Sequence, residues 1–107
     1  SRGILATCTA RAGDASLESV LDCLDVAYAD EPFVHVLPPG RWPTTGATLG
    51  SNSVHLQAAL DPSTHRVTVV AAEDNLVKGA AGQAVQNANL MLGLPETAGL
   101  SAIGIAP

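Results

Sequence analysis

The residues with the clearest chemical possibilities lie where the last helix of the chain is expected to begin. A lysine and two glycines occupy the first turns of an otherwise strong helical pattern, in the run Glu73-Asp74-Asn75-Leu76-Val77-Lys78-Gly79-Ala80-Ala81-Gly82. Each glycine costs roughly 1 kcal/mol relative to alanine, and a cation near the N-terminus opposes the helix dipole. A sequence with both penalties is suited to hold a phosphate or carboxylate through free backbone N–H groups and positive charge.

When the residues are considered alone, a structural explanation of the same run is the default. The glycines also permit close packing, Lys78 can extend to solvent, and the G-x-x-G spacing lacks the G-x-G-x-x-G context of a dinucleotide site. Asp74 and Asn75 are alternative caps for the helix. If Asp74 is the cap, the Asn75 amide is available to a ligand.

Other polar residues carry weaker signals of chemistry. The segment Gly50-Ser51-Asn52 has the composition of a turn, although its polar groups could also line a cleft. His35, His55 and His65 are isolated in the sequence and are expected to be surface or structural residues.

The two cysteines form no metal-ligand cluster and no disulfide framework. Cys8 and Cys23 are therefore predicted to be buried thiols, and Cys8, on the apolar face of a strand, lacks the surroundings of a nucleophile. The sequence predicts no catalytic residue and no metal site.

Four strands and two helices are predicted to position these residues. Alternating apolar side chains indicate strands, and apolar residues at i, i+3 and i+4 indicate helices. Ser16 is the expected cap of the first helix. In chain order we expect a strand over residues 4–11, a helix over 16–29, a strand over 33–37, a hairpin of strands over 54–60 and 66–72, and a helix over 76–92.

The second helix is predicted to pack through one apolar stripe. Its alanines allow close approach to a sheet or another helix. The stripe comprises Val77, Ala81, Ala84, Val85, Ala88, Met91 and Leu92. The tail over residues 93–107 is expected to dock on the rest of a longer protein.

The order of elements predicts an α+β fold. Residues 1–107 are expected to form one partial domain, in which two helices cover one face of a largely antiparallel or mixed sheet. The other face needs cover from a second subunit or a further domain, since strands such as residues 66–72 are apolar on both faces. The chain opens in a strand without an initiator methionine, which suggests part of a longer protein.

The composition argues against several classes of function. Ten acidic residues against five scattered basic ones give a net charge of -5, which disfavours binding to nucleic-acid phosphates. The apolar runs are shorter than the ~20 residues that span a bilayer, and no signal segment is visible. We therefore expect a cytoplasmic protein with neither a nucleic-acid nor a membrane partner.

The run from Asp74 to Asn87, continued from Asn89 to Thr97, closely resembles the C-terminal signature of N-acetyl-gamma-glutamyl-phosphate reductases. The resemblance extends over nearly the whole chain and makes Pro107 the expected natural C-terminus. It implies part of a C-terminal domain like that of glyceraldehyde-3-phosphate dehydrogenase, which forms a dimer through its sheet. Further matching segments are Arg2-Gly3-Ile4-Leu5, Tyr28 with Glu31-Pro32-Phe33-Val34, and Gly50-Ser51-Asn52.

Such reductases use NADPH to convert a small acyl phosphate, N-acetyl-gamma-glutamyl phosphate, to its semialdehyde in arginine biosynthesis. The resemblance implies a cysteine thioester and a histidine acid/base, in a Gly-Cys-x-Pro segment and a His-x-x-His-Thr-Pro-Glu-type segment. Neither segment, nor the family's phosphate-binding glycines, has a match in this sequence. Cys8 is not assigned the vacant role.

Three residues of this chain are predicted by the resemblance to bind the cofactor. Asn75 matches the Asp-Asn motif that related phosphorylating aldehyde dehydrogenases present to the nicotinamide carboxamide. Lys78 and Gly79 match the start of the helix that faces the nucleotide domain. The roles of Arg2 and Ser51-Asn52, in a substrate cleft or in the structure, stay open.

Three hypotheses follow from the sequence. The chain is the later part of the substrate and dimerisation domain of such a reductase and is inactive alone. Alternatively, it is a non-catalytic dimerisation module. The third hypothesis is a stand-alone anion binder built on the helix that carries Lys78.

Overall fold

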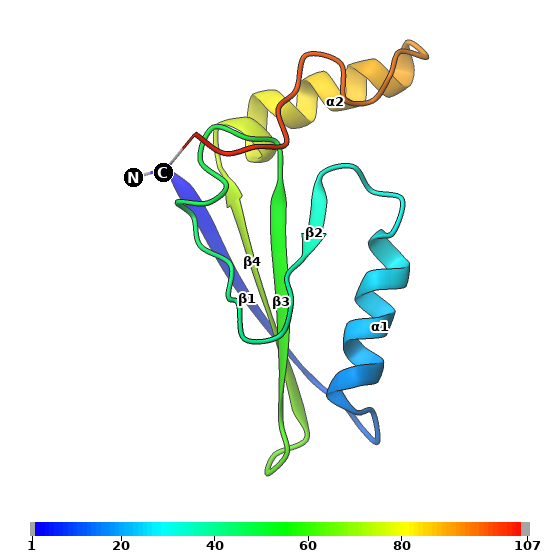
Figure 1. Ribbon diagram of the computed structural model, residues 1–107, viewed down its shortest axis with the longest axis vertical. Helices are drawn as coiled ribbons and strands as arrows, with labels where there is room; N and C mark the ends of the chain where they lie inside the picture. Colours follow the sequence, from blue (N-terminus) through cyan, green and yellow to red (C-terminus); the bar gives the residue numbers. More distant parts are fainter. Residues whose placement is uncertain (1, 106–107) are drawn as a thin grey trace.

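A computed structural model describes residues 2–105 of the chain as a sheet with helices packed beside it (Figure 1). Residues 106 and 107, which include the expected C-terminus, lie outside the described residues. The elements in chain order are strand β1 (Gly3–Arg11), helix α1 (Leu17–Tyr28), strands β2 (Val34–Val36), β3 (Val54–Asp61) and β4 (Arg66–Asp74), a π-helical turn η1 (Val77–Ala81), and helix α2 (Gly82–Met91).

The four strands form one mixed sheet in the order β1-β4-β3-β2. The β3–β4 hairpin and the β1–β4 pair are antiparallel, whereas β2 and β3 are parallel, with His35 opposite His55. The predicted hairpin is confirmed, and in its turn the Asp61 carboxylate accepts hydrogen bonds from the Ser63 N–H, at 2.8 Å, and from two hydroxyl groups. The predicted α+β fold class and mixed sheet are therefore confirmed.

Helix α1 forms as the sequence predicts. The Ser16 hydroxyl accepts a hydrogen bond from the Ser19 N–H at 3.1 Å, which satisfies one of the free donors of the first turn. The helix packs on β2 and β3, where Leu56 and Ala58 of β3 are buried. The inward, half-buried side chains are those of Leu17, Val20, Leu21 and Leu24.

The opposite face of the sheet is covered at one end by the loop between β2 and β3, together with the tail that follows α2 (Figure 1). Phe33 lies directly before β2 and is buried, and the loop ends in a fully buried polar stretch over residues 51–53. The predicted turn at Gly50 is confirmed by its φ of 75°. A positive φ favours glycine because that residue has no Cβ.

Strand β1 is exposed along its whole length. The prediction of buried thiols is wrong, because Cys8 on β1 and Cys23 on α1 are both exposed. Their apolar surroundings in the sequence are real, but no described residue of this chain packs over them.

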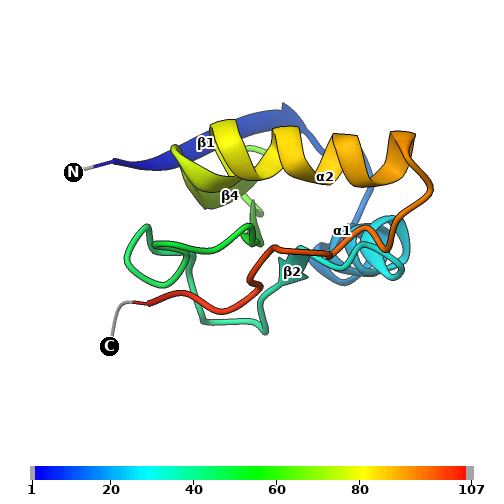
Figure 2. The same ribbon diagram turned by 90° about the horizontal axis from the view of Figure 1, so that it is seen from above.

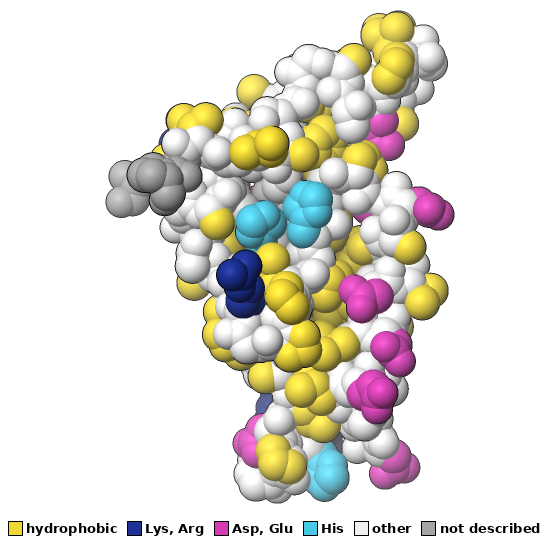
Figure 3. Space-filling model, viewed as in Figure 1, with side chains coloured by type: hydrophobic (Ala, Val, Ile, Leu, Met, Phe, Trp, Pro, Cys, Tyr) yellow, Lys and Arg dark blue, Asp and Glu magenta, His cyan; other side chains and the backbone are white. Residues whose placement is uncertain are grey.

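On the face shown in Figure 3, hydrophobic side chains gather in a band down the middle, with acidic side chains along the α1 edge.

The predicted packing face of the second helix is also wrong. The helix buries Gly82, Gln86 and Asn89, whereas the predicted apolar stripe is largely exposed, with Val85 at 42% and Met91 at 85% exposure. The reason lies in the neighbouring surface, since the loop and tail beside α2 offer polar groups that Gln86 and Asn89 satisfy. The helix lies across the end of the sheet and extends on the side of α1 (Figure 2).

The helix also starts differently from the prediction of one regular element over residues 76–92. The Ala81 N–H donates to the Leu76 carbonyl at 3.1 Å, and the Gly82 N–H donates to the Val77 carbonyl, so the first turn is π-helical.

The tail that follows α2 lies on the chain's own loop, where the Asn52 N–H donates to the Ser101 carbonyl at 2.7 Å. No helix among the described residues is long and apolar enough to cross a membrane.

Candidate functional site at the entrance to the last helix

The carboxylate of Asp74 joins three segments of the chain at the end of β4. One oxygen accepts hydrogen bonds from Arg2, at 3.0 Å from Nε and 2.6 Å from Nη2, and from the Gly50 N–H at 2.6 Å. The other oxygen accepts from the Leu76 N–H at 2.9 Å and the Val77 N–H at 3.3 Å. Of the two predicted caps, Asp74 is the one that the structure uses.

The Asp74 side chain is fully buried, so its ionisation depends on these donors. Burial by itself raises the pKa of a carboxyl group. The hydrogen bonds from Gly50, Arg2, Leu76 and Val77 outweigh that burial and lower the pKa of Asp74 to about 2. The group is therefore a carboxylate at neutral pH, paired with the Arg2 guanidinium.

Asn75 and Gly79 lie together on the exposed side of the helix entrance. The Asn75 N–H donates to the Arg2 carbonyl at 3.2 Å. A Cβ atom on Gly79 would lie 3.2 Å from the Asn75 side-chain oxygen and 3.3 Å from a carboxylate oxygen of Glu73. The absence of a side chain at position 79 therefore leaves room for the Asn75 amide beside the backbone.

The Lys78 side chain turns away from this surface and into the molecule. Its ammonium donates to the Gln86 side-chain oxygen at 2.8 Å and lies 5.8 Å from the centre of the Phe33 ring. Burial lowers the pKa of Lys78, while the charges of Glu73, Glu31 and Glu96 act in the opposite direction. Of the three predicted cofactor residues, the structure brings Asn75 and Gly79 together and places the Lys78 ammonium elsewhere.

A buried network of hydrogen bonds connects α2 to the loop before β3 and to the tail. The Gln86 oxygen also accepts from the Asn52 amide at 2.8 Å, and the Gln86 amide donates to the Glu96 carboxylate at 2.6 Å. The Asn89 amide donates to the Glu96 and Ala98 carbonyls, each at 3.0 Å. Sequence analysis missed this network, although a polar stripe of Gly82, Gln86 and Asn89 at i, i+4 and i+7 opposite the apolar one signals it.

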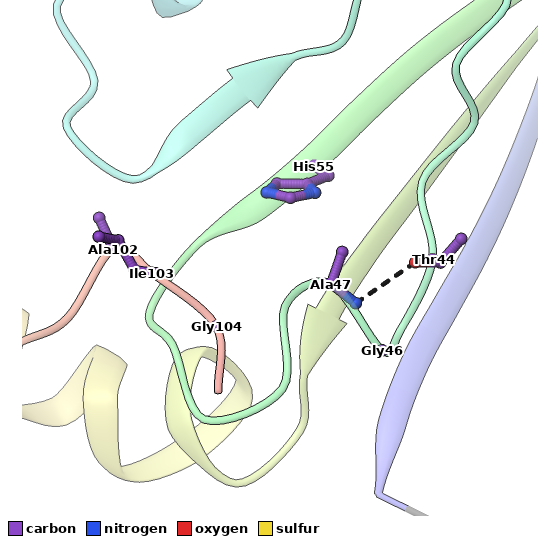
Figure 4. A pocket seen from close by; sticks show the side chains of 7 residues that line it. All are labelled: Thr44, Gly46, Ala47, His55, Ala102, Ile103 and Gly104. Atoms are coloured by element: carbon purple, nitrogen blue, oxygen red, sulfur yellow. Dashed lines mark hydrogen bonds between the residues drawn. The ribbon is translucent and has the colours of Figure 1, made fainter. Parts of the chain in front are cut away.

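A hollow with a volume of about 540 Å³ lies on the face of the sheet that the loop covers. His55 points into it from β3, between the loop and the tail (Figure 4). Two of the histidines that are isolated in the sequence meet in the fold, because the parallel pairing sets the His35 ring 5.6 Å from the His55 ring, edge to face. The remaining lining residues are Thr44, Gly46, Ala47, Ala102, Ile103 and Gly104.

The hydrogen bonds around His35 define its tautomer. The Ser53 hydroxyl donates its one proton to the Ala102 carbonyl at 2.7 Å, so it accepts from His35 Nε2–H at 3.1 Å. Burial and the neighbouring His35 both lower the pKa of His55. Within residues 2–105, no three metal-ligating side chains come together. Through Ser53, the His35 side chain links β2 to the end of the loop and to the tail at Ala102.

Comparison with known proteins identifies the class of protein to which this sheet belongs. Residues 1–75 match the family described as the dimerisation domain of semialdehyde dehydrogenases. The chain therefore belongs to this family, whose description indicates homo-oligomerisation.

The most similar of the compared proteins share one name, which is narrower than the family description. The chain is 66% identical to the N-acetyl-gamma-glutamyl-phosphate reductase of Frankia casuarinae and 64% identical to that of Acidothermus cellulolyticus, each over 99% of its length. It is 54% identical to the reductase of Streptomyces avermitilis, also over 99% of its length. The chain spans 31% of the length of each of these relatives.

Proposed function

We propose that the chain is the later part of the substrate and dimerisation domain of an NADP-dependent N-acetyl-gamma-glutamyl-phosphate reductase. The observation that carries the proposal is the identity of 54% to 66% with reductases of that name over almost the entire chain. In this proposal the complete enzyme acts in the cytoplasm on a small acyl phosphate, as a step of arginine biosynthesis. The 107 residues alone are inactive.

The helix entrance fits a contact with the cofactor through Asn75 and Gly79. Capping by Asp74 leaves the exposed Asn75 amide available, and Gly79 places no side chain beside it. When bound, NADPH supplies the hydride for the reduction. In this proposal the Asn75 amide would orient the nicotinamide through its carboxamide, and Gly79 leaves room for that amide because it carries no side chain.

Lys78 has a different part in the proposal. Its ammonium is held by Gln86, so it contributes its charge and not a direct contact. Three carboxylates, those of Glu31, Glu73 and Glu96, lie close enough to interact with it. The lysine thus makes the potential at the helix entrance less unfavourable for an anionic cofactor.

The proposed chemistry uses neither cysteine of this chain. Cys8 lies opposite Val69 in the sheet, five residues before Asp74 along β4, which corresponds to about 17 Å. Cys23 lies on the exposed side of α1. The nucleophile therefore belongs to the part of the enzyme outside these residues.

The proposed dimer forms through the sheet. Apart from the loop and the tail at one end, the face that carries Thr7 and Val70 has no cover among the described residues (Figure 1). The described hydrophobic core is small and comprises Phe33, Leu56, Ala58 and Ala72. A second copy packed on the sheet provides the apolar area that this core lacks.

A chimeric enzyme tests the proposed activity. The chain replaces its aligned counterpart in the Acidothermus cellulolyticus reductase, with which it shares 64% identity. We expect phosphate-dependent reduction of NADP with N-acetylglutamate semialdehyde within about tenfold of the parent enzyme. The same relative without the replaced residues is the negative control.

The chimera also distinguishes the reductase proposal from the alternative function, a dimerisation module that takes no part in catalysis. The uncovered sheet and the family description favour that alternative. A chimera that folds and dimerises, yet neither binds NADP nor turns over substrate, would overturn the reductase proposal and leave the module.

A further inference from the structure

The most heavily bonded side chain in the described structure stands one residue before the proposed cofactor contact. Asp74 is fully buried and accepts five hydrogen bonds. Its donors come from the residue before β1, from the loop before β3 and from the turn that follows β4. One carboxylate therefore sets the relative position of three segments that are distant in the sequence.

Asn75 inherits its position from this arrangement. Its own N–H is held by the Arg2 carbonyl, while the Arg2 guanidinium is held by Asp74. The next two backbone N–H groups, of Leu76 and Val77, are held by the same carboxylate. The backbone is thus fixed on both sides of Asn75, and its side chain projects next to Gly79.

We infer that Asp74 is a positioning residue for catalysis, which acts through Asn75 and depends on its ion pair with Arg2. The inference rests on the proposed function, because it concerns the contact between Asn75 and the nicotinamide. Asp74 itself is buried and touches neither cofactor nor substrate. It holds the Asn75 amide in the orientation that the cofactor requires.

The negative charge of Asp74 is essential to this role. A neutral asparagine offers only one oxygen and turns an NH₂ group toward donors, so some of the five donors lose their acceptor. The buried donors then have no partner in the same position, and the turn shifts to satisfy them. Displacement of a positioning group by about 1 Å is enough to cost roughly 100-fold in rate.

The test is a double-mutant cycle in the active chimera, with Asp74→Asn, Asn75→Ala and the two combined. We expect each single change to lower kcat/KM for NADP by roughly 10- to 100-fold and to leave KM for the semialdehyde unchanged. If Asp74 acts through Asn75, kcat/KM of the double variant is no lower than that of the less active single variant.

Two outcomes overturn the inference while leaving the proposed function intact. One is multiplication of the two losses in the double variant. The other is an effect of Asp74→Asn confined to KM for the semialdehyde. If the chimera with both native residues has no activity, the proposed function itself fails and the inference falls with it.

A milder variant keeps the test decisive if Asp74→Asn does not fold. Arg2→Gln removes two of the five donors and leaves the three backbone donors in place. We expect the same pattern, a lower kcat/KM for NADP that is absent in an Asn75→Ala background. Arg66→Gln is the matched control, because Arg66 bonds Thr9 at the opposite end of β4 and should leave the kinetics unchanged.

Discussion

At the scale of single residues, most of the information in this chain lies in buried polar groups. The fully buried side chains include Asp74, Asn52 and Gln57, and few large apolar residues are buried with them. Buried polar groups are stable only with partners, and these have them, with the exception of the Asn52 side-chain oxygen. That oxygen lies against Gly82, where no side chain could fit.

His55 gives a prediction about pH. Because burial and the neighbouring His35 lower its pKa from the ordinary value of 6.5, the unfolded chain binds protons more readily than the folded one. The contribution to stability is complete above pH 6.5 and is lost as the pH falls through the lowered pKa of the folded state. We expect the urea midpoint to decrease between pH 7.5 and pH 5.5.

The matched variant is His55→Gln, which keeps a polar side chain at this position and removes the titrating group. Its urea midpoint should change less over the same pH interval. An equal change in the two proteins would show that His55 is not responsible for the pH dependence.

At the scale of elements, the sequence predicted the strands and helices well because periodicity and turn chemistry are local. The cap at Ser16 and the turn at Asp61 are examples. Pairing between distant segments is not encoded in periodicity, so the parallel contact of β2 with β3, which joins His35 to His55, was missed.

The second helix shows a further limit of such prediction. Its pattern identified an apolar stripe, but periodicity does not say which surface that stripe meets. In this chain the neighbouring surface is polar, so Gln86 and Asn89 point inward and the apolar stripe is left for another surface. The capping by Asp74 was within reach of sequence analysis, whereas its bonds to Arg2 and Gly50 were not.

The junction between the π-helical turn and α2 gives a prediction at this scale. Replacement of glycine by alanine inside a helix normally stabilises it by about 1 kcal/mol. A Cβ atom on Gly82 would instead overlap the Asn52 side-chain oxygen and lie 2.7 Å from the Val77 carbonyl oxygen. We expect Gly82→Ala to lower the free energy of unfolding by about 1–3 kcal/mol in guanidinium titrations.

A second glycine serves as control for this variant. A Cβ atom on Gly46 would meet nothing within 4 Å. Gly46→Ala should therefore leave the unfolding midpoint nearly unchanged. A Gly82→Ala protein as stable as the native chain would contradict the close packing of Asn52 on α2.

At the scale of the whole molecule, the described chain is flatter and more open than a self-contained domain. Its radius of gyration is 15.0 Å, and its extents are 45 × 31 × 19 Å. A compact domain of this length has a radius of gyration of about 13 Å. Apolar side chains of the exposed β1 and of the outer face of α2 lie on the outside of this open shape.

The chain matches only about a third of the length of the reductases, and this explains why the site could be predicted only in part. Asn75 and Gly79 lie together, whereas Cys8 and Cys23 lie elsewhere in the described part of the chain. The reductases that resemble the chain are about three times its length. In our account, catalysis needs the remainder of the enzyme, and the sheet needs a second copy.

The most direct test of this account is the molar mass of the pure chain in solution. Light scattering during gel filtration at micromolar concentration should give twice the 10.8 kDa of the chain. Thr7→Arg places a like charge on each copy in the exposed sheet and should give the mass of one chain, while Val26→Arg, on the exposed side of α1, should stay dimeric. A native chain that is monomeric at this concentration, or a Thr7→Arg protein that remains a dimer, would contradict dimerisation through the sheet.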